Sequence, residues 1–581
     1  MQLHARRRHA VARCRALITA AAFALALAAL LCFSLVPPGG MLAAPARALQ
    51  LVPARRLHVR LGAVKGYTTT ATATPAAGGR ATKAQPDAAV LLPDWEALVL
   101  LRADAADAAG NVTCRFRGGA TSPARALGRL PAPGRSGRRA YACAVPEPAR
   151  RHKTLPAPQL VIASSSTSKR TVGAARGGGR STEMLRWSGR LVYESAVVDG
   201  GDVLVFAKGV NPRQGVNRPA SDIQCVYYRA GDHVVATLPA ATSAQQVFRC
   251  PPPPTPVQQE SQEEIRVTLA VTGQEPLPSL AVYNPPRAAS STAPEKKLIC
   301  ACTMVRDVAK FLPEWVVYHA AVGVDRFYLY DNGSEDDLAD QVHHLNAAGY
   351  DVSTVAWPWT KAQEAGFSHS AAAHRHSCQW MAFVDVDEFI FSPQWNQSNN
   401  PDKSTMLRSV VSSAEPDVGQ VSLGCADFGP SGQTSNPEEG VTQGYTCRRR
   451  TQERHKSLLR LDAVDDSLVN SIHHFALRPG FQGQWNKQVR VNHYKYQAWE
   501  EFKVKFRRRV STYVADWTDP VNLKSKDRTP GLGFEAVEPV GWTHKFCQVN
   551  DTLLRDATRR WFGAGFRNGP ARRQTGTSSS S

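Results

Sequence analysis

The sequence lacks C-x-x-C pairs although it contains 12 cysteines, and this absence excludes a zinc ribbon. It also lacks the regular spacing of a histidine metal cluster, because the four histidines that could suggest one are scattered: His473, His474, His493 and His544. All but two cysteines follow the first long apolar run, and their even number predicts disulfides in an oxidising compartment. We expect local bridges between Cys114 and Cys143 and between Cys225 and Cys250.

Acidic residues are few beside basic ones, since 49 aspartates and glutamates oppose 70 lysines and arginines for a net charge of +21. In a cytosolic protein this excess would suggest nucleic-acid binding. For a chain on the far side of a membrane, an acidic polysaccharide or a nucleotide diphosphate is the better partner, and we expect no nucleic acid. Arginines scattered through an Ala/Arg-rich sequence would explain the charge equally well.

An apolar run at residues 16–36 follows a basic segment at 1–15. The run is long enough to cross a bilayer as a helix, and its positive flank keeps the short N-terminal tail in the cytosol. A cleaved signal peptide is the alternative, but the run is longer than a usual signal core and Pro37–Gly40 is a poor cleavage site. We therefore expect a single-pass type II membrane protein with a lumenal body. Glycosylation sequons fit the secretory pathway: Asn111, Asn396 and Asn550.

The first half of the lumenal body predicts a stem and an all-β domain. Residues 37–89 contain little that could build a core, which is typical of a flexible stem. Short strand-like runs separated by Gly/Pro-rich turns over 90–287 predict a β-sandwich. Within it, 118–139 and 164–180 resemble disordered insertions. Aromatic residues of this domain either stack on sugar rings or fill its core: Trp95, Trp187, Tyr193, Tyr227 and Tyr228.

After a polar linker at 288–297, strand and helix patterns alternate. Apolar strands are predicted at 298–305, 325–331 and 351–357, with amphipathic or polar helical segments between them. This alternation predicts an α/β domain with a mostly parallel sheet and helices on both faces. Ligands of such sheets bind beyond the carboxyl ends of the strands. Polar residues follow several of these ends: Arg306, Asp307, Asp331, Asn332, Asp385 and Asp387.

In the segment Trp380–Phe391 an apolar run is interrupted by a short acidic knot that contains Asp385, Asp387 and Glu388, and the segment predicts one buried strand. Asp385 and Asp387 are two residues apart, so in a strand they project to the same face. Two buried carboxylates need a cation between them, and oxygen ligands suit a hard divalent ion such as Mg²⁺ or Mn²⁺. The alternative is an acidic turn that only ends the strand, since short acidic motifs are common.

Several segments of the α/β region together resemble glycosyltransferase family 92. They are Cys302–Asp307, Glu314–His319, Tyr328–Asn332, Asp385–Phe389, His455–Ser457 and His544–Cys547. The resemblance covers about 298–547. The order of anchor, stem, β-sandwich and α/β domain, together with Asp427–Gly432 and Glu439–Arg449, is similar to the plant β-1,4-galactan synthases of that family.

The resemblance implies a fold, a reaction and a location. It implies a GT-A catalytic domain over 298–560, followed by a disordered tail at 561–581. It implies inverting transfer of galactose from UDP-galactose to β-1,4-galactan side chains of pectin (rhamnogalacturonan I). It also implies a Golgi membrane enzyme with its catalytic domain in the lumen, and we further expect a homodimer.

The prediction of a metal site rests on both the acidic motif and the resemblance. Asp385 and Asp387 are expected to hold Mn²⁺ or Mg²⁺, and the resemblance suggests His544 as a third ligand. The ion would stabilise the charge that gathers on the departing UDP. Lys456 or Lys545 would neutralise phosphate.

The rest of the substrate site needs a nucleoside grip and a base. Arg306, Asp331 and Asn332 lie at the strand ends where uridine is expected. An inverting displacement needs a base for the acceptor hydroxyl, and Asp427 and Glu439 remain two open candidates. Each would otherwise be an ordinary solvated loop carboxylate.

Other functions are also compatible with the sequence. A family 92 enzyme could use another donor or acceptor, and a lectin-like membrane protein could carry an inactive transferase domain. A glycosidase is disfavoured, because its two carboxylates flank the scissile bond from about 5 Å or more apart, usually on different elements.

Overall fold

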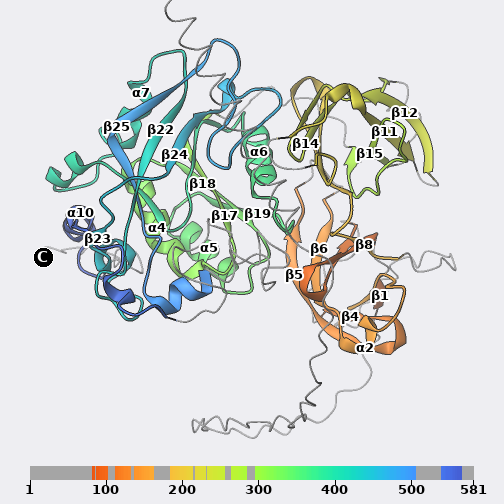
Figure 1. Cartoon of the computed structure of the whole chain (residues 1–581), viewed down its shortest axis with the longest axis horizontal. Coiled ribbons are helices and arrows are strands. Elements are labelled where there is room, and N and C mark those ends of the chain that lie inside the picture. The colour runs from red at the N-terminus through yellow and green to blue at the C-terminus, as the bar shows by residue number, and fades with distance from the viewer. Residues whose placement is uncertain are drawn as a thin grey trace, which may run out of the picture. The chain divides into compact units, whose positions relative to one another are not determined.

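The computed structural model describes residues 82–84, 87–102, 112–131, 137–162, 183–212, 216–229, 232–255, 264–283, 295–505 and 538–565 (Figure 1). The predicted anchor at 16–36 and the insertion at 164–180 lie outside the described residues. No helix within the described ranges is both long and apolar enough to cross a membrane.

The first all-β part is a single eight-stranded sheet in the order β1-β7-β4-β5-β6-β3-β2-β8. Its neighbours pair antiparallel except β2 with β8. The strands are β1 (Thr82–Ala84), β2 (Ala88–Leu92), β3 (Glu96–Leu101), β4 (Val112–Arg115), β5 (Thr121–Arg129), β6 (Arg139–Ala144), β7 (Gln159–Ile162) and β8 (Leu185–Arg186); a short helix, α2 (Glu147–Arg150), follows β6. The prediction of a disordered insertion at 118–139 is wrong for β5, because this strand pairs with both β4 and β6.

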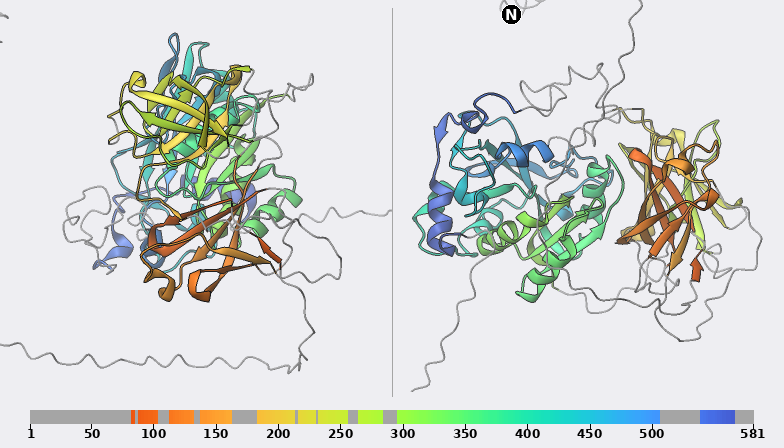
Figure 2. Two further views of the ribbon diagram at one scale, coloured as in Figure 1. Left: turned by 90° about the vertical axis from the view of Figure 1, so that its right-hand side faces the viewer. Right: turned by 90° about the horizontal axis from the view of Figure 1, so that it is seen from below.

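The second all-β part is a sandwich of two four-stranded sheets, β13-β14-β10-β9 and β12-β11-β15-β16. A shared core joins both sheets and includes Val205 and Phe248 from one and Tyr227 and Leu269 from the other. The sequence predicts one sandwich over the whole β region. The structure instead divides this region into two parts, because β1–β8 pair in one sheet and β9–β16 form the sandwich. The strands, yellow and olive in Figure 2, are β9 (Leu191–Val197), β10 (Val203–Lys208), β11 (Ile223–Arg229), β12 (His233–Pro239), β13 (Thr242–Ala244), β14 (Val247–Cys250), β15 (Ile265–Val271) and β16 (Val282–Tyr283).

Four disulfides cross-link the described chain. The two predicted bridges are confirmed: Cys114–Cys143 joins β4 to β6, and Cys225–Cys250 joins the two sheets of the sandwich. The structure adds bridges within the α/β part, Cys300–Cys378 and Cys447–Cys547. The two free described cysteines are both buried: Cys302 and Cys425.

The α/β part contains a second eight-stranded sheet in the order β19-β18-β17-β20-β24-β22-β25-β21. The four strands β19, β18, β17 and β20 pair in parallel, as the alternation of strands and helices predicts. The strands are β17 (Lys297–Val305), β18 (Arg326–Asp331), β19 (Val352–Ala356), β20 (Cys378–Phe383), β21 (Glu388–Phe391), β22 (Val418–Asp427), β24 (His455–Arg460) and β25 (Gln482–His493). A separate two-stranded sheet pairs β23 (Cys447–Arg448) with β26 (Val549–Asn550).

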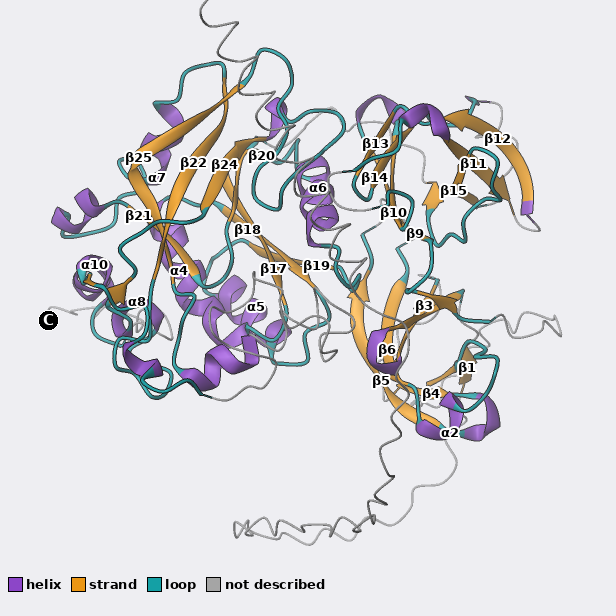
Figure 3. Ribbon diagram, viewed as in Figure 1, coloured by secondary structure: helices purple, strands orange, loops and turns teal. Residues whose placement is uncertain are grey.

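Alternate residues of β17 enter two different cores, one on each face of the sheet. Ile299 and Ala301 pack in a core that includes residues of α4 and α5, whereas Cys300 and Cys302 pack with residues of α6. This follows from the two-residue period of a strand that is buried on both faces. Figure 3 shows the helices of this part, which are α4 (Leu312–Val322), α5 (Leu338–Ala347), α6 (Gln363–Ala373), α7 (Leu407–Ser412), α8 (Val441–Gly444) and α10 (Leu553–Phe562).

The acidic segment is not one strand, as the sequence suggests, but two strands joined by a turn. β20 ends at Phe383 and lies between β17 and β24, whereas β21 begins at Glu388 and pairs with β25 at the sheet edge. The apolar pattern alone could not reveal this break, because both strands are buried and hydrophobic on either side of the turn. Asp385 and Asp387 therefore lie in the turn that links two distant positions of the sheet.

Candidate active site

The turn between β20 and β21 is closed by its own acidic residues. Glu388 N–H donates to the backbone carbonyl of Asp385 at 3.0 Å, and Asp385 N–H donates to Glu388 Oε2 at 2.9 Å. The Glu388 side chain is fully buried. These bonds bring the carboxylates of the acidic run close together beyond the carboxyl end of β20.

Lys456 supplies a buried positive charge to this turn. It lies near the start of β24, which pairs antiparallel with β20 and therefore begins at the edge where β20 ends. Its Nζ lies 2.9 Å from Asp385 Oδ2 and 2.8 Å from Glu388 Oε1. Burial raises the pKa of Asp385, but the charge of Lys456 outweighs it and holds that pKa below its usual range. Lys456 thus keeps Asp385 ionised in the interior.

His493 joins the acidic turn from β25. Its position at the end of β25 is opposite Glu388 of β21 and Asp427 of β22. His493 Nε2 lies 3.3 Å from Asp387 Oδ2 and 3.7 Å from Glu388 Oε1. One ligand atom each from Asp387, Glu388 and His493 lies within 4.8 Å of the others. Among the described residues this is the group with the spacing of a metal site.

Asp427 orients His493 from the other side. Its Oδ1 lies 3.0 Å from His493 Nδ1, and its Oδ2 accepts a hydrogen bond from Lys495 Nζ at 3.3 Å. Burial raises the pKa of Asp427, but His493 and Lys495 overcome it and hold the pKa below the usual range. A carboxylate on one imidazole nitrogen leaves the other free to ligate, which is a common arrangement around metal-binding histidines.

The chemistry of this group fits a divalent cation. Glu388 Oε1 is buried and pairs with Lys456 Nζ at 2.8 Å, so this carboxylate is held ionised beside Asp387 and His493. Two carboxylates and an imidazole form a donor set that Mn²⁺ accepts. Lys505 donates to Asp387 Oδ2, so an ammonium group also reaches this carboxylate. A bound cation would have to share or take over the Asp387 contact.

The Glu314–His319 segment explains how β21 is held beneath the site. Trp315 Nε1 donates to the carbonyl of Glu388 at 3.1 Å, and Tyr318 hydroxyl donates to the carbonyl of Ile390 at 2.7 Å. His319 Nε2 accepts from Ile390 N–H at 3.3 Å. All three side chains are buried in α4. This motif therefore positions the strand that begins with Glu388.

The predicted nucleoside residues lie at the ends of β17 and β18, where the sequence places them. Asp331 Oδ1 accepts from the N–H groups of Gly333 and Ser334, and so fixes the loop after β18. Asn332 Nδ2 donates to the carbonyls of Trp357 and Trp359, which ties that loop to the end of β19. Arg306 is partly exposed and lies 4.0 Å from the neighbouring Asp307. Their contacts with a nucleoside remain predictions.

Three other predicted residues lie outside the acidic group. Glu439 is partly exposed and pairs with Arg559 at 3.8 Å. His544 and Lys545 are both exposed, with His544 in a short 3₁₀ turn. His544 does not belong to the metal-spaced group of the described residues. The metal-ligand role of His544 stays a prediction, and so does the phosphate contact of Lys545.

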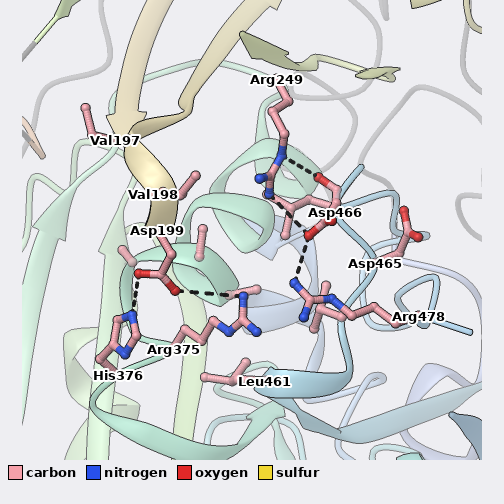
Figure 4. Close-up of a pocket in the computed structure, with 17 residues that line it drawn as sticks. Val197, Val198, Asp199, Arg249, Arg375, His376, Leu461, Asp465, Asp466 and Arg478 are labelled. Carbon is pink, nitrogen blue, oxygen red and sulfur yellow. Dashed lines mark hydrogen bonds and ion pairs between the residues drawn. The ribbon is translucent and has the colours of Figure 1, made fainter. Parts of the chain in front are cut away.

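A separate cavity of about 570 Å³ is lined by charged pairs (Figure 4). Arg478 contacts Asp466 at 2.7 Å, and Arg375 lies 3.9 Å from Asp199. None of the acidic-turn residues lines this cavity. The acidic turn is the better candidate for chemistry, because it contains the metal-spaced group of Asp387, Glu388 and His493.

Comparison with known proteins gives the family. Residues 295–523 match the model of glycosyltransferase family 92. A family 92 protein of Oryza sativa subsp. japonica is 39% identical over 70% of this chain and 72% of its own length. The chain belongs to glycosyltransferase family 92. A family 92 protein of Ricinus communis, 42% identical over 64% of this chain and 67% of its own length, agrees with this assignment.

The family membership confirms the glycosyltransferase prediction, and the acidic group therefore lies in the domain that carries glycosyl transfer. The similarity to solved structures is too weak to support an assignment of function. The crystal structure of S. aureus TarS 1–349 is 12% identical in sequence, and the match covers 37% of this chain and 66% of the TarS chain with a TM-score of 0.22.

Sequence reasoning assigned no role to Glu388 or Lys505, and His493 was set aside as a metal ligand because its spacing fits no histidine cluster. Glu388 directly follows Asp387, so the length of the acidic run was a usable signal. His493 and Lys505 reach the turn from more than 100 residues away along the chain. No local pattern marks them, because only the register of β25 against β21 and β22 brings His493 to the site.

Proposed function

We propose that this family 92 glycosyltransferase transfers galactose from UDP-galactose to β-1,4-galactan side chains of pectin, with inversion at the sugar carbon. The proposal rests on the likeness of Asp427–Gly432 and Glu439–Arg449 to the galactan synthases. The structural observation that carries it is the Asp387, Glu388 and His493 group at the edge of an α/β sheet. Such an edge is where α/β proteins bind nucleotides.

The residues of the site divide the work on the donor. A Mn²⁺ or Mg²⁺ ion held by Asp387, Glu388 and His493 would offset the charge that develops on the departing diphosphate. Asp385, proposed from the sequence as a ligand, is held ionised by Lys456 and keeps the turn closed. Lys456 is thereby fixed as a buried cation beside the carboxylates, whereas a phosphate contact by Lys545 would come from an exposed side chain.

The two candidate bases differ in their surroundings. Asp427 is buried, and both its oxygens already face cations or imidazole, so its low pKa makes it a weak proton acceptor. Its geometry favours positioning His493. Glu439 is more exposed and lies beside Arg559, which leaves it accessible to an acceptor hydroxyl. We therefore favour Glu439 as the base.

The location is proposed from the sequence. The basic flank and the apolar run at 16–36 support a single-pass type II protein of the Golgi membrane with a lumenal catalytic domain. Disulfides in every described part of the chain fit an oxidising compartment. The β-sandwich would hold long acceptors, and a homodimer is a further proposal.

A donor screen tests the proposal. The full-length protein in detergent is incubated with a galacto-oligosaccharide and a panel of UDP-sugars, including UDP-arabinopyranose, with and without Mn²⁺. We expect extension by UDP-galactose, and a β-1,4 linkage in the product. Extension by a different sugar, with none from UDP-galactose, would replace galactose by that donor while leaving the family assignment intact.

A further inference from the structure

Trp485 is an exposed aromatic side chain on β25. Its exposed fraction is 58%, higher than that of Trp95 at 39%, the other large aromatic exposed in the described chain. The remaining exposed large apolar residues are valines, none on β22, β24 or β25: Val216, Val234, Val504 and Val540. A lone exposed tryptophan without an apolar patch does not suit a protein interface.

Two pairs of consecutive residues connect Trp485 to the candidate active site. Lys456 Nζ lies 2.6 Å from His473 Nε2, and this pair faces Asp385. The residues next to them in the chain, His455 and His474, form a second pair in which the two imidazoles contact each other. His455 and Lys456 are successive residues of β24 and point to opposite faces, and accordingly Lys456 is buried whereas His455 is exposed.

The second pair lies against the tryptophan. The ring of Trp485 meets that of His455 edge to face, with 4.9 Å between ring centroids. His455 is the first residue of β24, and β24 starts at the sheet edge where β20 ends before the acidic turn. The indole of Trp485 therefore contacts His455, and the next residue of the chain, Lys456, contacts Asp385 in the acidic turn.

The two histidines have the character of neutral hydrogen-bonding groups. Burial and the charge of Lys456 lower the pKa of His455 below its ordinary value. Burial and the neighbouring His455 lower the pKa of His474 to about 4. Neutral imidazole offers one donor and one acceptor, which suits hydroxyl groups better than anions.

We propose that Trp485, with His455 and His474 at its edge, forms a subsite for a neutral sugar ring of the acceptor chain. The indole supplies a rigid apolar face for the ring, and the imidazoles supply partners for its hydroxyl groups. The subsite holds a sugar next to the reacting end and so aligns a long acceptor. This inference rests on the proposed function in taking a galactan chain as the acceptor.

The test measures acceptor binding apart from the reaction. The full-length wild type and Trp485→Ala are titrated calorimetrically with β-1,4-galactotetraose in the absence of donor. We expect the variant to bind about tenfold or more weakly, which is the usual loss when a central aromatic contact is truncated. Trp485→Phe keeps an aromatic face and should recover most of the affinity.

Two controls separate this effect from damage to the fold or to the donor site. Phe481 directly precedes the first residue of β25, and its ring packs under Arg460. Phe481→Ala removes this ring and should leave the affinity for the tetraose unchanged. Trp485→Ala should show the same thermal stabilisation by UDP with Mn²⁺ as the wild type. Its loss of transfer should be larger for long galactan than for a disaccharide acceptor.

The outcomes distinguish the subsite from the proposed function. Equal affinity of wild type and Trp485→Ala for the tetraose overturns the subsite, and so does an absence of tetraose binding by a wild type that extends galactan. A wild type that transfers no galactose from UDP-galactose overturns the proposed function instead. That second result comes from the donor screen and does not depend on Trp485.

Discussion

Lys505 donates a hydrogen bond to Asp387, the same carboxylate that faces His493 Nε2 at 3.3 Å. The ammonium group thus neutralises a carboxylate of the metal-spaced group. Lys505 is one-third exposed, whereas Lys456 is nearly buried between Asp385 and Glu388. Of these two lysines, Lys505 is the one that a divalent cation can displace more readily.

Replacing Lys505 by glutamine should therefore tighten binding of Mn²⁺ alone. The variant removes a charge that competes for Asp387, and we expect the dissociation constant for Mn²⁺ to fall about threefold to tenfold. Calorimetric titration without nucleotide measures this directly. Lys503→Gln is the matched control, because Lys503 pairs with Glu500 on the same segment and should leave the affinity unchanged. A weaker affinity in Lys505→Gln would contradict competition.

Replacing Asp427 by asparagine should separate positioning from base catalysis. If Asp427 orients His493, Asp427→Asn weakens Mn²⁺ binding by roughly 10–100-fold. Glu439→Gln should instead lower kcat by roughly 10²–10⁴ and leave Mn²⁺ affinity intact. The pair of titrations and rates assigns each carboxylate. Normal Mn²⁺ affinity with a low kcat in Asp427→Asn would make Asp427 the base, against our assignment.

The sequence predicted the order of elements better than the composition of the site. The central parallel strands follow from buried apolar runs and the helices between them, and the acidic run was visible at once. The place of His493 in the metal-spaced group could not be predicted from the sequence. It depends on the pairing of β25 with β21 on one side and with β22 on the other. The break after Phe383 was hidden for a related reason: apolar residues continue on both sides of the turn.

Tyr318→Phe should weaken the support of β21. Losing the hydroxyl leaves the buried carbonyl of Ile390 without this donor, at a cost of about 1–3 kcal/mol in the free energy of unfolding. Tyr227→Phe is a control of the same kind in the sandwich, where the hydroxyl donates to the carbonyl of Pro251. Thermal melts should show a loss for both variants, but only Tyr318→Phe should also weaken Mn²⁺ binding. Equal Mn²⁺ affinity in both would show that β21 is held without Tyr318.

Acid should destabilise the α/β part before its carboxylates titrate. Burial lowers the pKa of His319 and of His369 from 6.5 to about 4, so both stay neutral in the folded chain. The unfolded chain takes up these protons below about pH 6.5, so the stability present above that pH is lost as the pH falls towards 4. Each fully buried histidine contributes about 3 kcal/mol to this loss. Melting temperatures between pH 7 and pH 4 measure it, and a flat profile would contradict the buried neutral state.

The central claim is that Asp387 helps to hold the cation that the donor diphosphate needs. Asp387→Asn keeps the size of the side chain and removes one charge from the group formed with Glu388 and His493. Asp340→Asn, at an exposed position of α5, serves as the matched control. The most direct measurement is thermal stabilisation by UDP with Mn²⁺, made beside glycosyl transfer in the same preparations. We predict an Asp387→Asn protein that melts normally without ligand, gains no stability from UDP with Mn²⁺ and has almost no transferase activity, while Asp340→Asn behaves as wild type. Full activity in Asp387→Asn, or a wild type indifferent to EDTA, would contradict the account.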